Sequence, residues 1–221
     1  GILTNEAEYE AMLPHLYPLP AVDEVSWQER ARLQAEGDVA LWFTLDGYFW
    51  FARTLLGIER HLYAFFDQPD LMHRINHDLT EHSLKVIDEV CAICTPDFMT
   101  FGEDMSYNHG PMLSQDLFNE FMAPYYRRIL PVLHERGIIA IIDSDGDITV
   151  PAHWFEEVGI EGILPLERQA GVDMAVLRQE HPRMRFIGHF DKMVMNKGEA
   201  AMRAEFERHL QRCCFFRLGR F

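Results

Sequence analysis

Short, nearly continuous apolar runs recur along this chain, and each is followed by a stretch in which apolar residues have helical spacing. A run that alternates little with polar residues is typical of a strand buried on both faces. Strands that alternate with helices in this way predict a parallel sheet with helices packed outside it. The predicted strands cover residues 39–45, 98–102, 138–142, 162–165, 185–188 and 214–219.

The number of predicted strands falls short of a closed eightfold barrel, which has eight strands and about 250 residues. For this chain of 221 residues we therefore predict an α/β fold, a (β/α)8 TIM barrel that lacks its first two βα units, as a single domain over residues 1–221. A doubly wound sheet is the alternative, but no Gly-x-Gly-x-x-Gly turn follows the first strand. Because the chain opens at Gly1 and closes on a strand-like segment, we expect a fragment of a longer protein.

Two features of the connecting segments lead to specific expectations. One helix is predicted from Ser114 to about Gly137, and Pro124 inside it should bend it. In the turn after the 138–142 strand, Gly146 gives the backbone freedom and Asp147 is predicted to cap the helix at about 149–158.

The composition limits the classes of function. A formal net charge of −15 and a pI near 5.1 argue against a nucleic-acid binder, which needs a surplus of Lys and Arg. No apolar run approaches the roughly 20 residues of a membrane span, and no secretory signal opens the chain, so we expect a cytoplasmic protein without a membrane partner. Cys91 and Cys94 have no second pair at zinc spacing, and we interpret them as ordinary reduced cysteines at a helix end.

Polar side chains follow the predicted strands at the points where the strands end. Asp145, Glu167 and His189 are separated by 22 residues in each case, Glu103 and Asp104 follow the 98–102 strand, and Asp46 follows the 39–45 strand. Parallel strands bring their carboxyl ends to one face, where residues far apart in the sequence can share a pocket. These side chains are therefore candidates for catalysis or binding.

The turn containing Asp143 and Asp145 leaves several kinds of chemistry open. The alternate Asp residues resemble the start of a calcium loop, but Trp154 stands where the twelfth-position Glu belongs, and we reject that interpretation. Either aspartate could bind a metal, hold a cationic or hydroxylated ligand, or act as an acid or base if burial raises its pKa.

Three strand-end residues form one candidate metal site. Asp145, Glu167 and His189 could supply oxygen and nitrogen ligands to a metal, or form a polar pocket floor without one. The plainer alternatives are an ion pair between Glu167 and Arg168 and a hydrogen-bonded rim position for His189. On the loop after Glu103, Tyr107 and His109 could reach over the barrel mouth or only form hydrogen bonds within the loop.

Several of these motifs, in this order, resemble the uroporphyrinogen decarboxylase superfamily from about Val39 to Phe221. The resemblance implies a (β/α)8 barrel with its site at the mouth. The superfamily includes cofactor-free decarboxylases that act on the acetate side chains of a tetrapyrrole, and corrinoid-linked methyltransferases in which zinc activates a thiol. The motifs are the segment from Glu103 to Ser114, the helix from Phe118 to Ile129 with its Pro-Tyr-Tyr, the turn 143–148, Pro165-Leu-Glu167 and Gly188-His-Phe-Asp-Lys192.

The chain also departs from both branches of the superfamily. The methyltransferases have a His-x-Cys pair after the strand that matches 138–142, where this chain has Asp143 and Asp145, so their sulfur-rich zinc site is absent. The decarboxylases place arginines and an aspartate from early strands around the substrate carboxylates, and those strands are missing here. Their Phe-Asp-Ser turn matches Gly102-Glu-Asp104 only loosely, and their late histidine would fall beyond Phe221.

The leading hypothesis is a decarboxylase-like lyase that acts on a carboxylate-bearing, tetrapyrrole-type small molecule without a cofactor. The alternative is a corrinoid-dependent methyltransferase that works with a corrinoid protein and holds zinc through Asp145, Glu167 and His189; a non-catalytic ligand-binding barrel is the third. A homodimer is the remaining partner that we consider. The expected catalytic residues are Glu103, Asp145, Glu167 and His189, and the expected substrate-binding residues are Asp46, Asp104, Tyr107, His109, Asp143 and Asp191.

Overall fold

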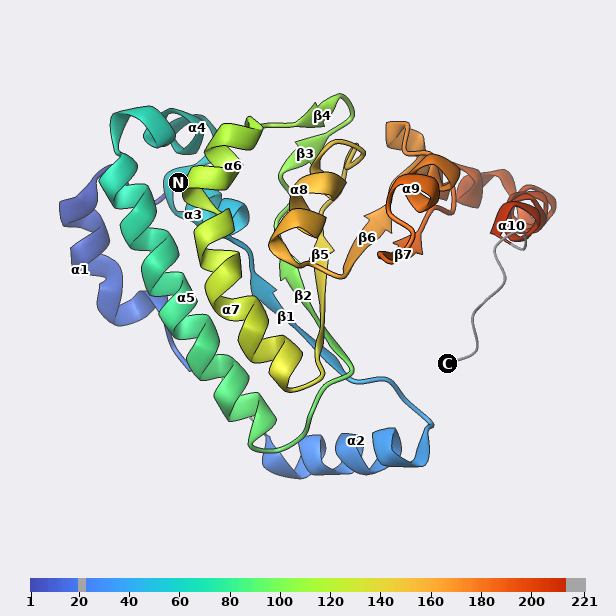
Figure 1. Cartoon of the computed structure of the whole chain (residues 1–221), viewed down its shortest axis with the longest axis horizontal. Helices are drawn as coiled ribbons and strands as arrows, with labels where there is room; N and C mark the ends of the chain where they lie inside the picture. The colour runs from blue at the N-terminus through green and yellow to red at the C-terminus, as the bar shows by residue number, and fades with distance from the viewer. Residues whose placement is uncertain (20–22, 214–221) are drawn as a thin grey trace.

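Five parallel strands form one sheet in the computed structural model, which describes residues 1–19 and 23–213 (Figure 1). The strands are β1 (Trp42–Asp46), β2 (Phe98–Gly102), β5 (Ile139–Asp143), β6 (Gly162–Leu166) and β7 (Arg185–Gly188). All neighbouring strands pair in parallel, which confirms the predicted α/β pattern. The predicted strand at 214–219 lies outside the described residues.

The strand order separates the two predicted architectures. It runs β1-β2-β5-β6-β7, in chain order and without reversal. A doubly wound sheet reverses its order at a switch point, whereas a barrel wall adds each strand beside the previous one. The sheet is therefore a stretch of barrel-like wall, and within the described part of the chain β1 and β7 are its two edges.

Helices cover one face of this wall. They include α3 (Tyr48–Leu56), α5 (Pro69–Cys91), α7 (Ala123–Glu135) and α8 (Pro151–Val158), with α5 and α7 packed side by side (Figure 1). Alternate strand residues point to them, because side chains along a strand alternate between its faces. Met99, Phe101, Ala140, Ile142 and Ile163 belong to this core.

The opposite face of the wall is less covered near β1. Trp42 is 55% exposed and stacks on Phe98 of β2 with ring centroids 5.4 Å apart. Thr44 is also exposed, and its hydroxyl lies 2.7 Å from the Thr100 hydroxyl on the neighbouring strand. These residues occupy the side that faces the interior in a closed barrel.

Two predictions about helix ends are corrected by the structure. The helix predicted from Ser114 to Gly137 is two helices, α6 (Gln115–Phe121) and α7, separated at Met122. Pro124 falls in the first turn of α7, where its missing N–H is not needed, so it starts a helix instead of bending one. Asp147 does not cap α8, which begins after Val150; its carboxylate accepts from Thr149 N at 3.0 Å.

The remaining elements frame the two ends of the sheet. At the amino ends of the strands, α2 (Glu24–Glu36) is held by Gln34 Nε2, which donates to the Thr95 carbonyl at 3.0 Å and to Asp97 at 2.9 Å. At the carboxyl ends lies the hairpin of β3 (Ser106–Tyr107) and β4 (Gly110–Pro111) (Figure 1). The others are α1 (Glu6–Leu16), α4 (Ile58–Asp67), α9 (Met174–Glu180), α10 (Glu199–Cys213) and the 3₁₀ helices η1 (Arg168–Ala170) and η2 (Lys192–Lys197).

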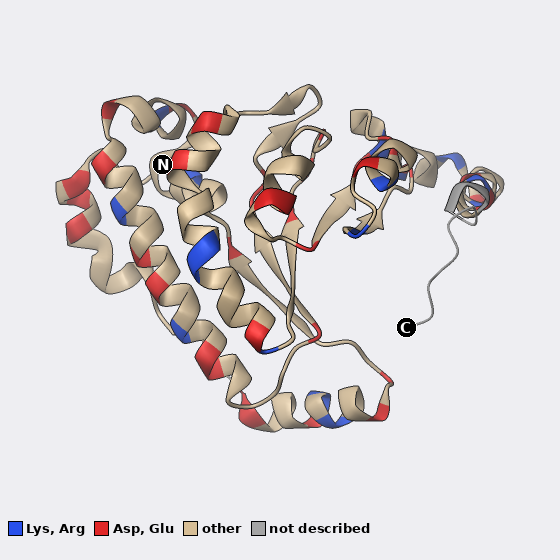
Figure 2. Cartoon of the chain, viewed as in Figure 1, with Lys and Arg blue, Asp and Glu red and all other residues tan. Residues whose placement is uncertain are grey.

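Acidic residues are spread over the outer helices. The chain has 35 Asp and Glu against 20 Lys and Arg, and Figure 2 shows acidic residues on α1, α2 and α5. Among the described residues, no helix is both long enough and apolar enough to cross a membrane.

Candidate active site at the carboxyl ends of the strands

The strand pairing aligns three acidic strand ends. Asp46 at the end of β1 pairs in register with Gly102 of β2, and Gly102 pairs with Asp143 of β5. Asp143 in turn pairs with Leu164, two residues before the end of β6, and Glu167 follows that strand directly. The predicted convergence of strand ends is therefore present along one edge of the sheet.

Glu167 is fixed by three donors. It accepts from Gly146 N at 2.9 Å and from Gln169 Nε2 at 2.6 Å, and it forms an ion pair with Lys192 of η2. Desolvation acts to raise the pKa of Glu167, but the Lys192 ammonium and the hydrogen bonds outweigh it and hold the pKa below its usual value. Glu167 therefore stays ionised and holds Lys192 at the mouth.

The turn that carries Asp145 requires glycine at position 146. Gly146 has φ +89°, and a Cβ there would lie 2.7 Å from the Ser106 carbonyl carbon. The Asp147 N–H donates to the Tyr107 carbonyl at 2.9 Å, and the Met105 N–H donates to the Ser144 hydroxyl at 3.2 Å. The β3–β4 hairpin is thus packed directly on the turn that presents the aspartates.

Burial and neighbouring carboxylates act on both Asp143 and Asp145. Desolvation raises the pKa of Asp143, and the negative charges of Asp145 and Asp104 raise it further. Desolvation also raises the pKa of Asp145, with Glu167 and Asp104 adding to it and Lys192 opposing it. A carboxyl in such a cluster keeps its proton to a higher pH than a free one, which makes it a candidate for proton transfer.

Two basic side chains reach this carboxylate cluster. Lys192, whose side chain is 56% exposed, pairs with Glu167. Arg53 of α3 lies 3.5 Å from the Asp104 carboxylate and donates to the Asp104 carbonyl at 3.1 Å. Asp104 itself has φ +45°, which turns the chain sharply after β2. The cluster of Asp104, Asp143, Asp145 and Glu167 therefore carries more acidic than basic groups.

Glu103 does not line the mouth, contrary to the prediction. Its side chain is fully buried and accepts from Tyr48 N at 2.8 Å, from Phe49 N at 2.7 Å and from the Tyr126 hydroxyl. Burial raises its pKa to about 7, although these hydrogen bonds act in the opposite direction. The N-cap residue of α3 is Gly47, which has no side chain to accept from the first N–H groups of the helix. The Glu103 carboxylate, at the end of β2, accepts from them instead. The structure thus gives Glu103 a capping role away from the mouth, and its catalytic role stays a prediction.

His189 lies against the segment that leads into α9. It is 3% exposed, and its Nε2 lies 3.1 Å from the Val172 carbonyl oxygen and 3.5 Å from Met174 N, at the start of α9. Burial lowers the pKa of His189, which favours the neutral ring. The predicted metal set of Asp145, Glu167 and His189 is wrong: within residues 1–19 and 23–213, no group of three or more His, Cys, Asp or Glu is placed to hold an ion.

The other predicted binding residues lie in different surroundings. Tyr107 and His109 are exposed on the β3–β4 hairpin above the aspartate turn, with ring centroids 5.7 Å apart. Asp191 is the N-cap of η2 and accepts from Met193 N at 2.9 Å. Asp46 lines a pocket of about 200 Å³ together with His82 of α5, at the β1 edge.

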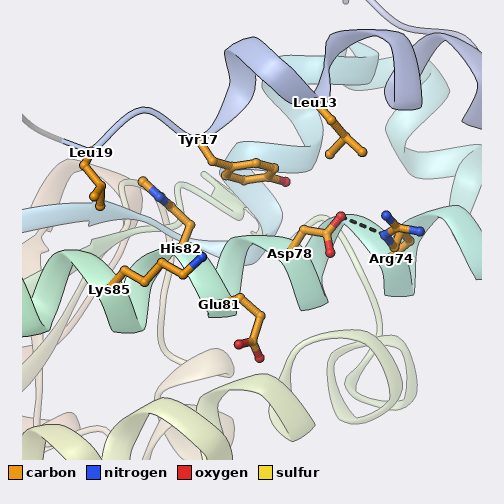
Figure 3. A pocket seen from close by; sticks show the side chains of 8 residues that line it. All are labelled: Leu13, Tyr17, Leu19, Arg74, Asp78, Glu81, His82 and Lys85. Carbon is orange, nitrogen blue, oxygen red and sulfur yellow. Dashed lines mark hydrogen bonds and ion pairs between the residues drawn. The ribbon is translucent and has the colours of Figure 1, made fainter.

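A larger pocket lies outside this site. It has a volume of about 440 Å³ and lies between α5 and the segment after α1, as Figure 3 shows. Tyr17 and Leu19 border it on one side, and the ion pair of Arg74 and Asp78, 2.8 Å apart, lies on the other. Because it borders helices rather than strand ends, we do not include it in the candidate active site.

The sequence did not single out Lys192 or Arg53 as site residues, although both pair with carboxylates of the cluster. Lys192 belongs to the motif Gly188-His-Phe-Asp-Lys192 and follows the predicted residue Asp191. Its position close to a strand end could have marked it as a candidate site residue. Arg53 belongs to α3, a helix whose position over the mouth cannot be read from local spacing.

Comparison with known proteins decides the family. A family profile described as Uroporphyrinogen decarboxylase (URO-D) matches residues 26–217. The chain belongs to the uroporphyrinogen decarboxylase family. The resemblance inferred from the motifs is thereby confirmed, and the matched region includes every residue of the carboxylate cluster.

A solved structure supports the fold of this family member. The chain is similar to a methyltransferase from Methanosarcina mazei with a TM-score of 0.56 and 16% sequence identity, over 73% of this chain and 47% of that one. At this identity the likeness concerns the fold alone, and the chain covers about half of the methyltransferase's length. No curated protein matches the sequence.

Proposed function

We propose that this member of the uroporphyrinogen decarboxylase family is a decarboxylase-like lyase. In this proposal Asp143 and Asp145 donate the proton that replaces the departing carboxylate. In decarboxylation the bond between carbon and the carboxylate breaks, CO₂ leaves, and the electron pair that remains on carbon takes up a proton. The observation that carries the proposal is the raised pKa of both aspartates at the carboxyl end of β5. A carboxyl with a raised pKa holds its proton to a higher pH than a free aspartate, and a proton held there can be delivered to the carbon.

In this proposal the two basic side chains near the carboxylate cluster bind the carboxylates of the substrate. Lys192 is largely exposed and held by Glu167, so its remaining N–H donors are available to a substrate carboxylate. Arg53, at 3.5 Å from the Asp104 carboxylate, supplies a second cation on the other side of the cluster. Tyr107, exposed on the hairpin, adds an aromatic surface against which a ring system can pack.

The test is turnover of a reduced, carboxylate-bearing tetrapyrrole by the wild type and by Asp143→Asn, Asp145→Asn and the double variant. Loss of the proton donor should lower kcat by about 100-fold or more in the double variant. Asp147→Asn is the matched control, because this aspartate stands in the same turn but bonds Thr149 N rather than joining the cluster. A double variant with the kcat of the wild type would exclude the proposal, and tight substrate binding without turnover by the wild type would favour the binding-only barrel.

The excess of carboxylates favours a second candidate, methyl transfer. Arg53 and Lys192 are each already paired with an acidic group, whereas within residues 1–19 and 23–213 the carboxylates of Asp143 and Asp145 form no hydrogen bond or ion pair. A methyl donor with a positively charged nitrogen or sulfur would be attracted to such a mouth. Methyl transfer to a reduced corrinoid, followed by its absorbance, tests this candidate; it would not use the predicted metal set, which the structure does not assemble.

A further inference from the structure

Cys91 and Cys94 lie on one helical turn at the end of α5. Ile93 N and Cys94 N both donate to the Val90 carbonyl, at 3.0 and 3.1 Å, so the chain continues its turn past the last helical residue. Residues three apart on such a turn have Cβ atoms about 5–6 Å apart, which is about 1–2 Å more than a disulfide requires. Both thiols are free in the structure, and Cys94 follows the end of α5.

The two thiols have different surroundings. Cys94 is 8% exposed, and desolvation raises its pKa, with Cys91 adding to the effect. Cys91 is half-buried and lines a surface pocket of about 390 Å³ together with Asp88, Thr95 and Arg136. One thiol is therefore accessible from solvent, while its neighbour is protonated and shielded.

A guanidinium lies beside the accessible thiol. Arg136, at the end of α7, pairs with the Asp88 carboxylate and donates to the Ile87 carbonyl at 3.3 Å. It lines the same pocket as Cys91, and the Cys91 side chain is the largest contribution to the raised pKa of Arg136. A cysteine reacts with oxidants as the thiolate, and of the two cysteines Cys91 is the one that solvent reaches.

We propose that Cys91 and Cys94 form a peroxide-sensitive pair, in which Cys91 is attacked first and Cys94 resolves the product as a disulfide. The Cys91 thiolate displaces hydroxide from hydrogen peroxide and becomes a sulfenic acid; the hydroxide takes up a proton to give water. The Cys94 thiol then attacks the Cys91 sulfur, the S–S bond forms, and a second water leaves. Two thiols and one peroxide thus give one disulfide and two waters.

The pair is separate from the proposed active site. It lies at the amino ends of the strands, next to Thr95, whose carbonyl accepts from Gln34 of α2, whereas the carboxylate cluster lies at the carboxyl ends. Oxidation would therefore change the link between α5, β2 and α2 without touching the mouth. Failure of the proposed decarboxylation would leave this proposal unaffected.

The experiment treats the protein with hydrogen peroxide in a Cys213→Ser/Cys214→Ser background, blocks the remaining thiols and identifies the products by peptide mass spectrometry. The expected product is a Cys91–Cys94 disulfide, seen as a loss of about two mass units from the peptide that contains both. In Cys94→Ser, a sulfenic-acid probe should label Cys91, whereas Cys91→Ser should leave Cys94 unlabelled. Labelling of Cys94 alone, or no disulfide while Met residues oxidise, would overturn the proposal.

Discussion

Replacing Glu103 by Gln should change both the stability of the protein and the way that stability depends on pH. Glu103 is fully buried and its two oxygens accept from two backbone N–H groups of α3 and from the Tyr126 hydroxyl. A glutamine offers only one oxygen, so at least one of these donors would lose its partner. A buried donor left without a partner costs about 1–3 kcal/mol.

The pH dependence follows from the raised pKa of Glu103. Its pKa is about 7 in the folded protein against 4.5 for an unperturbed glutamate. Between these values the folded protein holds a proton that the unfolded chain has released, so the free energy of unfolding falls as the pH rises through this window. The difference corresponds to about 3 kcal/mol. Glu103→Gln has no such titration and should not show this loss.

Urea denaturation of both proteins from pH 5 to pH 8 measures the difference. The wild type should be more stable than Glu103→Gln by about 1–3 kcal/mol at pH 5, and the gap should close or reverse by pH 8. Comparing the two proteins cancels the titration of all other groups. Glu89→Gln, on the exposed side of α5, is the control and should stay within about 0.5 kcal/mol of the wild type at every pH. A gap that does not change with pH would refute the inference that Glu103 is protonated near neutrality.

Three shorter predictions concern other sites. Gly146→Ala should destabilise the protein by about 2 kcal/mol more than Gly171→Ala, as measured by urea denaturation. Both glycines have positive φ, but only at position 146 would the new Cβ lie 2.7 Å from backbone atoms. Lys192→Met should raise the pKa of Glu167, followed by NMR titration, with a stability change below about 1 kcal/mol because the lysine is exposed. His61 is fully buried, both its ring nitrogens are unpaired, and burial lowers its pKa to about 3. The protein should therefore lose stability as the pH falls from about 6.5 towards 3, and His61→Phe should reduce that loss.

The sequence was sufficient to predict which residues follow the strands but not where their side chains point. Apolar runs located all five strands of the sheet to within a few residues, because burial on both faces leaves a continuous hydrophobic signature. Glu103 follows its strand as predicted, yet its carboxylate turns towards α3, a neighbour 55 residues away. His189 likewise turns towards Val172, whose position depends on the path of the chain into α9. Such directions are set by tertiary neighbours, which local patterns do not encode.

The carboxylate cluster also gives the two candidate functions opposite responses to pH. Asp104 is paired with Arg53 and Glu167 with Lys192, so the charge of the mouth depends on Asp143 and Asp145, whose pKa values are already raised. A bound carboxylate would raise those pKa values further, so binding takes up protons and affinity weakens as pH rises. A cationic methyl donor would lower them, so binding releases protons and affinity strengthens as pH rises. Calorimetric titrations in two buffers with different ionisation enthalpies measure the sign directly. Proton uptake with a carboxylate ligand would support the decarboxylase assignment, whereas proton release with a methylammonium ligand of comparable affinity would favour methyl transfer.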